Sequence, residues 1–329
     1  PSIDRGQFVM SGILSRDKLA GRIPYQGLIT FWRAPHTQAL ENVDLAVYGV
    51  PFDCEIFYRP GTRFGPRAIR EQSVYVGLVS PHWPFDFDLR EKYNVIDYGD
   101  IVFYPGRVEE MLSNVESEVG EMSARGIGTL GLGGDHLVAY PALKAHAKTH
   151  GKLSLIHFDA HTDTHDGPFL NHGSMFIYAA REGLIDPETS VQIGIRTFIP
   201  PDTKFNVMTS HECMDMKSKE IVEKIRTLVG DNPCYISLDV DGMDPAYAPG
   251  TGTPLPGGIT SAMQREILWG LQGLNIVGCD VVEVSPPYDP SQVTSVLGAT
   301  LGLDMLYIMA ASPALQKVKA KESMRAAQS

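Results

Sequence analysis

The chain has 329 residues and a formal net charge of −11, and 43% of its residues are hydrophobic while 20% are charged. This composition is typical of a folded globular protein and excludes a disordered or coiled-coil chain, and the acidic balance argues against a nucleic acid partner. Four cysteines lie apart without CxxC spacing, and no apolar run is as long as a membrane span. We therefore expect reduced thiols, a cytoplasmic location and no membrane contact.

In residues 1–35, Gly12, Gly21, Pro24 and Gly27 would interrupt any long helix or strand. We therefore expect an irregular N-terminal extension there. Beyond it, short apolar runs alternate with segments of helical spacing. We predict strands at 45–50, 94–98, 128–132, 152–158, 191–195, 234–238 and 276–284. We predict helices at 67–73, 108–125, 137–150, 175–182, 217–229, 261–271 and 295–309.

Strands that alternate with helices are typical of a mostly parallel sheet covered by helices on both faces. No internal repeat and no linker divides the chain after the extension. The sequence therefore predicts the α/β class, with a single three-layer α/β/α domain over residues 36–329.

Three predicted strands end in carboxylate or imidazole side chains. After 153–158 such side chains occupy every second position, which points them to the same side of an extended segment. After 234–238 two aspartates again alternate, and after 128–132 two glycines precede an Asp-His pair. Because ligands of parallel sheets bind beyond the carboxyl ends of the strands, we expect these side chains to converge. They are His136, Asp159, His161, Asp163, Asp239 and Asp241.

Four carboxylates and two imidazoles exceed the three or four protein ligands that one metal ion takes, and they suit two ions about 3.5–4 Å apart. Such a pair lowers the pKa of a bridging water toward neutrality. Oxygen and nitrogen donors without cysteine favour two Mn²⁺ per chain over a structural zinc, with Ni²⁺ as the alternative ion. The competing interpretation is that Asp239 and Asp241 cap a loop and that His136 is structural.

Further polar residues accompany these strand ends. His172 lies in a polar loop and could be a general acid, but on its own it is more typical of a residue that leads into the helix at 175–182. Glu283 lies at the end of an apolar strand, and we interpret it as a carboxylate for a small cationic substrate rather than as a buried ion pair. His165 either lines the pocket or faces solvent.

These motifs resemble those of the ureohydrolases, the arginase and agmatinase superfamily. The matching stretches are Gly-Gly-Asp-His at 133–136, Phe-Asp-Ala-His-Thr-Asp at 158–163 and Ser-Leu-Asp-Val-Asp-Gly-Met-Asp-Pro at 237–245. The stretches that look like the agmatinase branch are 61–66, 248–254 and 283–286. The resemblance covers roughly residues 31–310 and implies an arginase-like fold.

The resemblance implies a binuclear Mn²⁺ hydrolase of guanidino compounds that releases urea and an amine, with agmatine, giving putrescine, as the expected substrate. It also implies a homo-oligomer, a trimer or a hexamer. The implied metal ligands are Asp159 and Asp239 as bridges, His136 and Asp163 at one ion, and His161 and Asp241 at the other.

The resemblance implies that Glu283 binds the guanidinium and that His172 transfers a proton. A guanidinium is a poor electrophile because its charge is delocalised, so its hydrolysis needs a strong nucleophile held against the central carbon. Asp163 would orient that nucleophile, and His172 would protonate the leaving amine.

One loop departs from the agmatinase pattern. Residues 54–58 read Cys-Glu-Ile-Phe-Tyr, which is bulkier than the small-residue loop expected there. Glu55 would accept the tail ammonium of agmatine, whereas Phe57 would narrow the mouth, and His165 also departs from the pattern. Guanidinobutyrate, guanidine or an N-alkylated guanidine therefore remain alternative substrates.

Two other classes of protein also fit part of the pattern. A catalytically silent partner subunit would bind metal without turnover, but it could lose His172 or Glu283 at no cost in folding. A deacetylase-like metal hydrolase would not need ligands for a second metal ion. We therefore favour the binuclear hydrolase.

Overall fold

The computed structural model of the protein describes residues 23–78 and 81–316, and residues 1–22 of the expected extension lie outside them. The strands are β1 (Leu45–Gly49), β2 (Val95–Asp100), β3 (Gly128–Leu132), β4 (Ser154–Phe158), β5 (Val191–Ile195), β6 (Asn206–Thr209), β7 (Cys234–Asp239) and β8 (Ile276–Val282). The helices are α3 (Gly65–Val76), α4 (Leu89–Lys92), α5 (Val108–Ala124), α6 (Ala139–His150), α7 (Met175–Arg181), α8 (Ser210–Asp215), α9 (Ser218–Val229), α10 (Ser261–Gly270) and α11 (Val293–Ala310).

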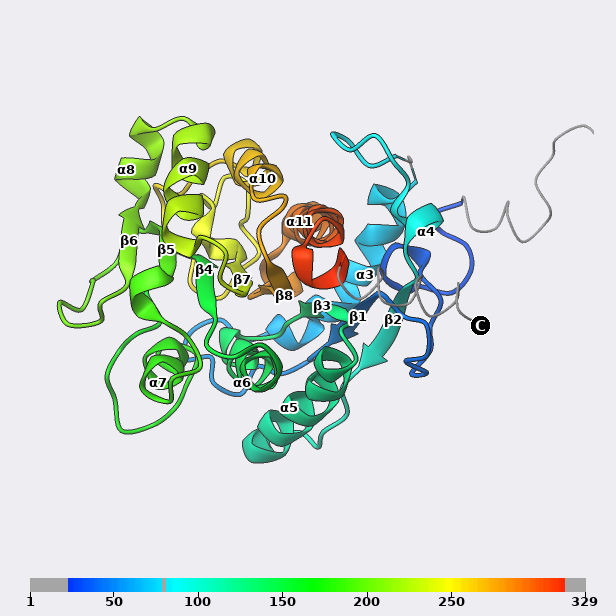
Figure 1. Ribbon diagram of the computed structural model, residues 1–329, viewed down its shortest axis with the longest axis horizontal. Coiled ribbons are helices and arrows are strands. Elements are labelled where there is room, and N and C mark those ends of the chain that lie inside the picture. Colours follow the sequence, from blue (N-terminus) through cyan, green and yellow to red (C-terminus); the bar gives the residue numbers. More distant parts are fainter. Residues whose placement is uncertain (1–22, 79–80, 317–329) are drawn as a thin grey trace, which may run out of the picture.

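The eight strands form one sheet in the order β2-β1-β3-β8-β7-β4-β5-β6, and every neighbouring pair is parallel. Helices α5, α6 and α7 cover one face, and α3 and α8 to α11 lie on the other (Figure 1). The predicted three-layer α/β/α fold is confirmed, and the sheet is parallel throughout the described residues.

Each strand and helix predicted from the sequence forms, with ends that differ by a few residues. The sequence did not indicate α4, β6 and α8, which contain only four to six residues each. Elements this short present no full period of buried positions, and β6 lies at the edge of the sheet, where it is only partly buried.

Buried periodic positions explain the main elements. All five residues of β1, β3, β4 and β5 are buried, as expected for strands covered on both faces. Helix α5 buries Met111, Val115, Val119 and Met122 on one stripe, and Gly126, with φ of 78°, ends the turn that follows it.

Two aromatic residues that precede β1 in the chain belong to the core. Phe31 and Trp32 are buried, and their backbone N–H groups donate to a carboxylate oxygen of Asp97 (2.6 Å) and to Oγ of Ser73 (2.7 Å). The described part of the expected extension is therefore anchored against β2 and α3 at these two positions.

Helix α11 and the residues just before it, Pro290–Ala310, are long and apolar enough to cross a membrane by length and composition. The protein buries 78% of this apolar window, and α11 packs against α3, α10 and β8. A helix that is hydrophobic all round is also typical of a protein core, so its length and composition are weak evidence for a membrane span.

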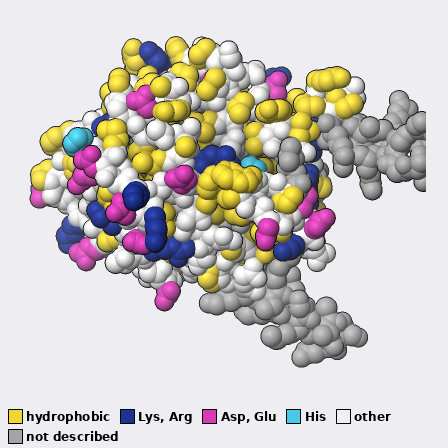
Figure 2. Space-filling model, turned by 90° about the horizontal axis from the view of Figure 1, so that it is seen from above, with side chains coloured by type: hydrophobic (Ala, Val, Ile, Leu, Met, Phe, Trp, Pro, Cys, Tyr) yellow, Lys and Arg dark blue, Asp and Glu magenta, His cyan; other side chains and the backbone are white. Residues whose placement is uncertain are grey.

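Hydrophobic side chains also gather in clusters between charged ones on the face seen from above (Figure 2). Among the exposed aromatic residues, Trp83 contacts Trp269 edge-on, with 4.7 Å between the ring centroids. The guanidinium of Arg265 lies 4.8 Å from the Trp269 centroid and pairs with the buried Asp304 of α11 at 2.8 Å. These contacts fasten the loop that holds Trp83 to the core.

Candidate metal centre and active site

The candidate site lies at the carboxyl ends of four neighbouring strands, β3, β8, β7 and β4. The residues at or just beyond these ends are His136, Glu283, Asp239 and Asp159, respectively. The turn after β3 requires glycine, because a Cβ at Gly134 would fall 1.7 Å from the carbonyl oxygen of Phe52. The strand ends that the sequence singles out thus meet at one edge of the sheet.

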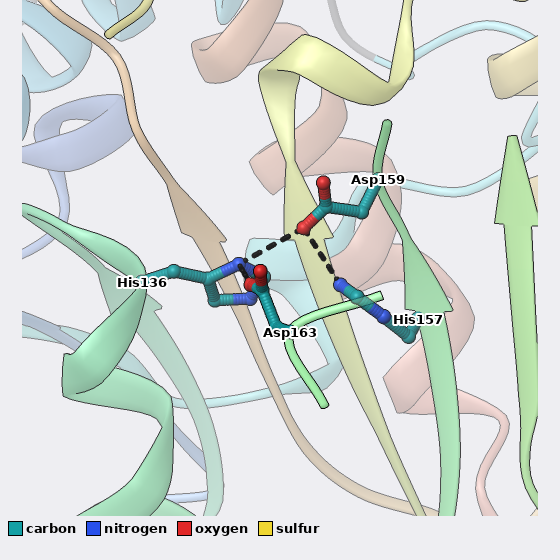
Figure 3. Close-up of side chains that lie close together, drawn as sticks. All are labelled: His136, His157, Asp159 and Asp163. Carbon is teal, nitrogen blue, oxygen red and sulfur yellow. Dashed lines mark hydrogen bonds and ion pairs between the residues drawn. The ribbon is translucent and has the colours of Figure 1, made fainter. Parts of the chain in front are cut away.

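In the first group of candidate ligands, the Nδ1 atom of His136 faces three carboxylates. Figure 3 shows two of them, Asp159 and Asp163. The distances to the Oδ2 atoms are 2.9 Å for Asp163, 3.1 Å for Asp159 and 3.5 Å for Asp239. All four side chains are buried, and Nδ1 makes no hydrogen bond of good geometry. Burial alone would lower the pKa of His136, but the carboxylates raise it well above its ordinary value. The group therefore attracts positive charge, and a divalent cation fits it.

Buried hydrogen bonds orient the His136 ring. Its Nε2 atom lies 2.8 Å from Oγ of Ser237, whose hydroxyl donates to Oδ1 of Asp280 at 2.8 Å. Because the hydroxyl proton points to Asp280, the Ser237 oxygen accepts from Nε2–H. In the neutral imidazole, Nδ1 then presents a lone pair to the carboxylate group, which is the tautomer that binds a metal ion.

In the second group, Nδ1 of His161 lies 3.2 Å from Oδ1 of Asp159 and 3.2 Å from Oδ2 of Asp241. Asp159 belongs to both groups, since its other oxygen, Oδ2, faces His136. Burial and the neighbouring Asp241 and Asp159 raise the pKa of Asp239 well above its ordinary value. Two clusters of buried acids that share a carboxylate fit two divalent cations held close together.

Asp163 and Glu283 both have left-handed backbone conformations, with φ of 49° and 64°. Residues other than glycine rarely adopt this region, and such strain is often found at functional sites. The backbone N–H of Glu283 donates to the carbonyl oxygen of Gly134 at 2.9 Å, which ties the end of β8 to the turn after β3. That turn leads directly to His136, so the two strand ends are fixed to each other.

A cavity of about 150 Å³ has both groups in its wall. Its size suits a small molecule, and its wall combines carboxylates, imidazoles and one aromatic ring. The residues that line it are Phe57, His136, His161, Asp163, His165, His172, Gly173, Asp239, Thr253 and Glu283.

His172 and Glu283 face each other in this cavity, with 3.3 Å between Nδ1 and Oε1. The same Oε1 accepts the backbone N–H of His136 at 2.9 Å. Burial lowers the pKa of His172, but the hydrogen bond to Glu283 and the charges of Glu283, Asp163 and Asp135 raise it to about 9. These neighbouring carboxylates therefore favour the protonated form of His172.

The residues expected near the mouth of the cavity, which we call its rim, are Glu55, Phe57 and His165. The structure places these three side chains differently from one another. Phe57 lines the cavity, and its ring meets that of His172 edge-on with 5.4 Å between centroids. His165 also lines the cavity, although it is exposed. Glu55 is not among the lining residues, and its backbone N–H donates to Oδ2 of Asp135 at 3.0 Å.

The model of the arginase family matches residues 43–307. The chain belongs to the arginase family. A relative named agmatinase from Serratia proteamaculans is 47% identical over 271 residues, covering 82% of this chain and 89% of the relative. A hypothetical agmatinase from Burkholderia thailandensis superposes with a TM-score of 0.81 at 42% identity, covering 87% of this chain and 92% of that one. Proclavaminate amidino hydrolase from Streptomyces clavuligerus does so with a TM-score of 0.81 at 38% identity, covering 88% and 99%.

The predicted resemblance is thus confirmed, and the protein is an agmatinase-like ureohydrolase. Arginase-family proteins act on guanidino compounds, are often oligomeric and contain a binuclear metal centre. The described residues include buried groups that could hold metal ions, in agreement with such a centre.

The sequence did not single out His157, although it lies against Asp159 (Figure 3). Nε2 of Gln192 donates to the carbonyl oxygen of Thr162 at 2.5 Å and lies 3.0 Å from Nδ1 of His157. That Nδ1 therefore accepts, and the opposite Nε2–H of His157 donates to Oδ2 of Asp159 at 2.8 Å. His157 thus supports a candidate ligand. The sequence feature that could have indicated this role is a histidine inside a buried strand, two positions before Asp159.

Thr253 is the second residue that sequence reasoning missed. Its hydroxyl donates to Oδ2 of Asp241 at 2.9 Å, and its side chain lines the cavity. It lies in the agmatinase-like stretch at 248–254, where glycines and prolines on both sides gave no reason to choose this residue.

Proposed function

We propose that this arginase-family enzyme hydrolyses agmatine to urea and putrescine in the cavity described above. The observation that carries the proposal is the pair of ligand groups sharing Asp159 in one wall with Glu283 and His172. Relatives named agmatinase at 46–47% identity over 82% of the chain support the choice of substrate.

The proposed ligands are the two groups of buried acids and histidines. Asp159 presents one oxygen to each group. Asp239 lies between the groups: its Oδ2 is 3.5 Å from Nδ1 of His136, and its Oδ1 accepts the backbone N–H of Asp241 at 2.7 Å. The donors are oxygen and nitrogen atoms only, which favours Mn²⁺, with Ni²⁺ as the alternative. Two such ions would supply a water of lowered pKa as the nucleophile. The full set is His136, Asp159, His161, Asp163, Asp239 and Asp241.

Glu283 is the proposed partner of the guanidinium. Its side chain is buried, and the backbone N–H of His136 holds its Oε1 atom in place. A carboxylate fixed in this way forms charge-assisted hydrogen bonds with a planar cation and sets its orientation before the reaction. Asp163 in the same wall is the proposed residue that orients the attacking water.

His172 is the proposed acid for the leaving amine. The carboxylates of Glu283, Asp163 and Asp135 raise its pKa and favour its protonated form, and it faces the same cavity as Glu283. An amine leaves only after it has gained a proton, and a positioned imidazolium supplies that proton.

A second candidate substrate is a guanidino compound without an amine tail. The observation that favours it is the wall of the cavity, which includes the ring of Phe57 but not Glu55, the residue expected to hold the tail ammonium. An amine tail left without an acceptor costs binding free energy, whereas a carboxylate or absent tail does not need that acceptor. A solved relative at 38% identity is named proclavaminate amidino hydrolase.

Urea release from agmatine, guanidinobutyrate, arginine and guanidine, with Mn²⁺ and then with Ni²⁺, separates the two candidates. The agmatine proposal predicts the highest kcat/KM for agmatine under both metals. If a short guanidine or guanidinobutyrate exceeds agmatine by about tenfold, the second candidate is correct.

We also propose that the enzyme acts as a trimer or hexamer in the cytoplasm, with residues 36–329 as one catalytic domain and residues 1–35 as an extension. Support for the oligomer comes from the family and from exposed aromatic residues such as Trp83, Phe169 and Phe198. Light scattering of the purified full chain tests it, and a monomeric mass would contradict it.

A further inference from the structure

Arg196 lies just beyond β5 and directs its guanidinium entirely at backbone carbonyl oxygens. Among the described residues, no carboxylate lies within ion-pair distance of it, so its hydrogen bonds serve the backbone. The acceptors are the carbonyl oxygens of Gly194, Asp241, Gly242, Met243 and Leu255, at 2.6–3.2 Å.

These bonds join three segments that shape the second ligand group. The backbone N–H of Arg196 donates to the carbonyl oxygen of Ala160 at 2.9 Å, and Ala160 lies between Asp159 and His161. The guanidinium binds the turn that carries Asp241, and Ala160 N–H donates to Oδ1 of that aspartate at 3.1 Å.

The third segment is the loop that forms part of the cavity wall. Leu255 accepts from Nε and Nη2 of Arg196 at 3.1 and 2.7 Å, two residues after Thr253. The hydroxyl of Thr253 donates to the second oxygen of Asp241. Both oxygens of Asp241 are thus held by segments that Arg196 fastens together.

The shape of the side chain explains why arginine occupies this position. A guanidinium presents five N–H donors in a rigid plane, which lets it bind several carbonyl oxygens at fixed angles, whereas a lysine ammonium is a compact charge on a flexible stem. None of the hydrogen bonds of Arg196 reaches His136 or Asp163 in the first group.

We propose that Arg196 is a positioning residue that holds the group of Asp159, His161 and Asp241 in the geometry that binds a metal ion. It acts through backbone carbonyl groups and touches neither the ion nor the substrate. This inference rests on the binuclear centre proposed above. It predicts that loss of the guanidinium weakens one ion and leaves the other unchanged.

The test measures metal binding as well as turnover. The full chain is stripped with a chelator and dialysed against graded Mn²⁺, and the bound ions per chain are determined by elemental analysis. We expect wild type to bind two ions, and Arg196→Met to bind one with wild-type affinity and the other about 10–100-fold more weakly. Arg196→Lys keeps the charge but not the planar fork, so its second ion should also be weakened.

Arg226 provides a matched control. It is also partly buried, and its guanidinium donates to the carbonyl oxygens of Gly270 (2.9 Å) and Gln272, remote in sequence from the ligand turns. Arg226→Met should therefore bind both ions as wild type does. Circular dichroism of each metal-free variant verifies the fold, and Arg196→Lys decides the question if Arg196→Met does not fold.

If wild type binds two ions, three results would overturn the inference. These are wild-type Mn²⁺ affinity in Arg196→Lys, equally weakened binding of both ions in Arg196→Met, or the same loss of Mn²⁺ affinity in Arg226→Met. The first would assign the effect to charge, and the other two to general destabilisation. Fewer than two ions in the saturated wild type would instead overturn the binuclear centre itself, and the inference with it.

Discussion

The floor and the rim of the cavity are built in different ways. In the floor, Asp159 and Asp239 are at most 4% exposed, and each accepts a backbone N–H two residues further along the chain, at 2.6 and 2.7 Å. In the rim, Phe57 is 83% exposed, and its ring meets that of His172 edge-on. The floor is thus fixed by strand ends and backbone bonds, whereas the rim depends on loops.

From this difference we expect the floor to determine the reaction and the rim to determine the choice of substrate. Buried acids that lose a partner incur a large penalty, so a change in the floor should alter the chemistry as a whole. A change in an exposed loop alters a few contacts with the substrate tail and should leave the chemistry in place. Four substitutions test this separation, from the largest expected effect to the smallest, and three further variants accompany them for comparison.

Asp239→Ala removes a floor carboxylate that contacts both ligand groups. We expect turnover to fall below detection and the metal content to fall from two ions toward one, because one group loses a ligand and the other loses its neighbour. Urea release and elemental analysis measure the two effects. Near-normal turnover of this variant, or a single ion in the saturated wild type, would end the binuclear assignment, whereas two ions in the saturated variant would show that Asp239 is not a required ligand.

His172→Ala removes the proposed acid from the boundary between floor and rim. We expect kcat to fall by about 10²–10⁴-fold, because the leaving amine must then take its proton from water. The variant should retain both ions, since His172 lies 3.3 Å from Glu283 and, among the described residues, forms no hydrogen bond with a proposed ligand. Loss of metal would show instead that His172 is a ligand or a structural residue.

His157→Phe keeps a planar ring against Phe176 but removes the donor to Asp159. We expect metal affinity to fall by about 10–100-fold with two ions still bound at saturation, as for other residues that orient a ligand. His157→Gln can place an N–H near the same oxygen and should restore part of the affinity.

His146→Phe is the matched control for that substitution. His146 is also fully buried, but its Nε2 bonds to Thr129 Oγ1 at 2.8 Å, away from the ligand groups. It should bind both ions normally. If saturated His157→Phe holds a single ion, His157 is itself a ligand, and the tautomer deduced from Gln192 is wrong.

Phe57→Ala opens the rim. We expect kcat/KM for agmatine relative to guanidine to rise by about tenfold or less, because the loss of one apolar contact changes discrimination only modestly. Metal content should not change. Tyr58→Ala in the same loop is the control, since Tyr58 is exposed and not among the cavity-lining residues. An equal change in both variants would remove the special role of Phe57.

The sequence predicted the fold and the floor because both follow from simple periodicities. Apolar runs of strand length alternate with helical stripes, and acids at alternate positions after strands must gather where the carboxyl ends meet. His161 and Asp241, 80 residues apart in the chain, lie 3.2 Å from each other for this reason. Their roles as metal ligands remain predictions that the metal measurements above will test.

The rim and the supporting residues could not be predicted in the same way. Glu55 and Phe57 are two positions apart in a loop, yet only Phe57 lines the cavity, because a loop has no fixed period that assigns side chains to a face. His157 and Gln192 act from inside two buried strands, where a polar residue is visible in sequence but its partner is not. Arg196 depends on carbonyl oxygens, which any residue provides.

The hydrogen bond from the backbone N–H of His136 to Glu283 joins two binding events in one thermodynamic cycle. A guanidinium that pulls on the Glu283 carboxylate also acts on the backbone of a residue in the first ligand group. Linkage is reciprocal, so whatever factor the metal contributes to substrate affinity, the substrate must return to metal affinity. Where that factor exceeds one, such an enzyme retains its ions best while substrate is bound, and it loses them most readily when substrate is scarce.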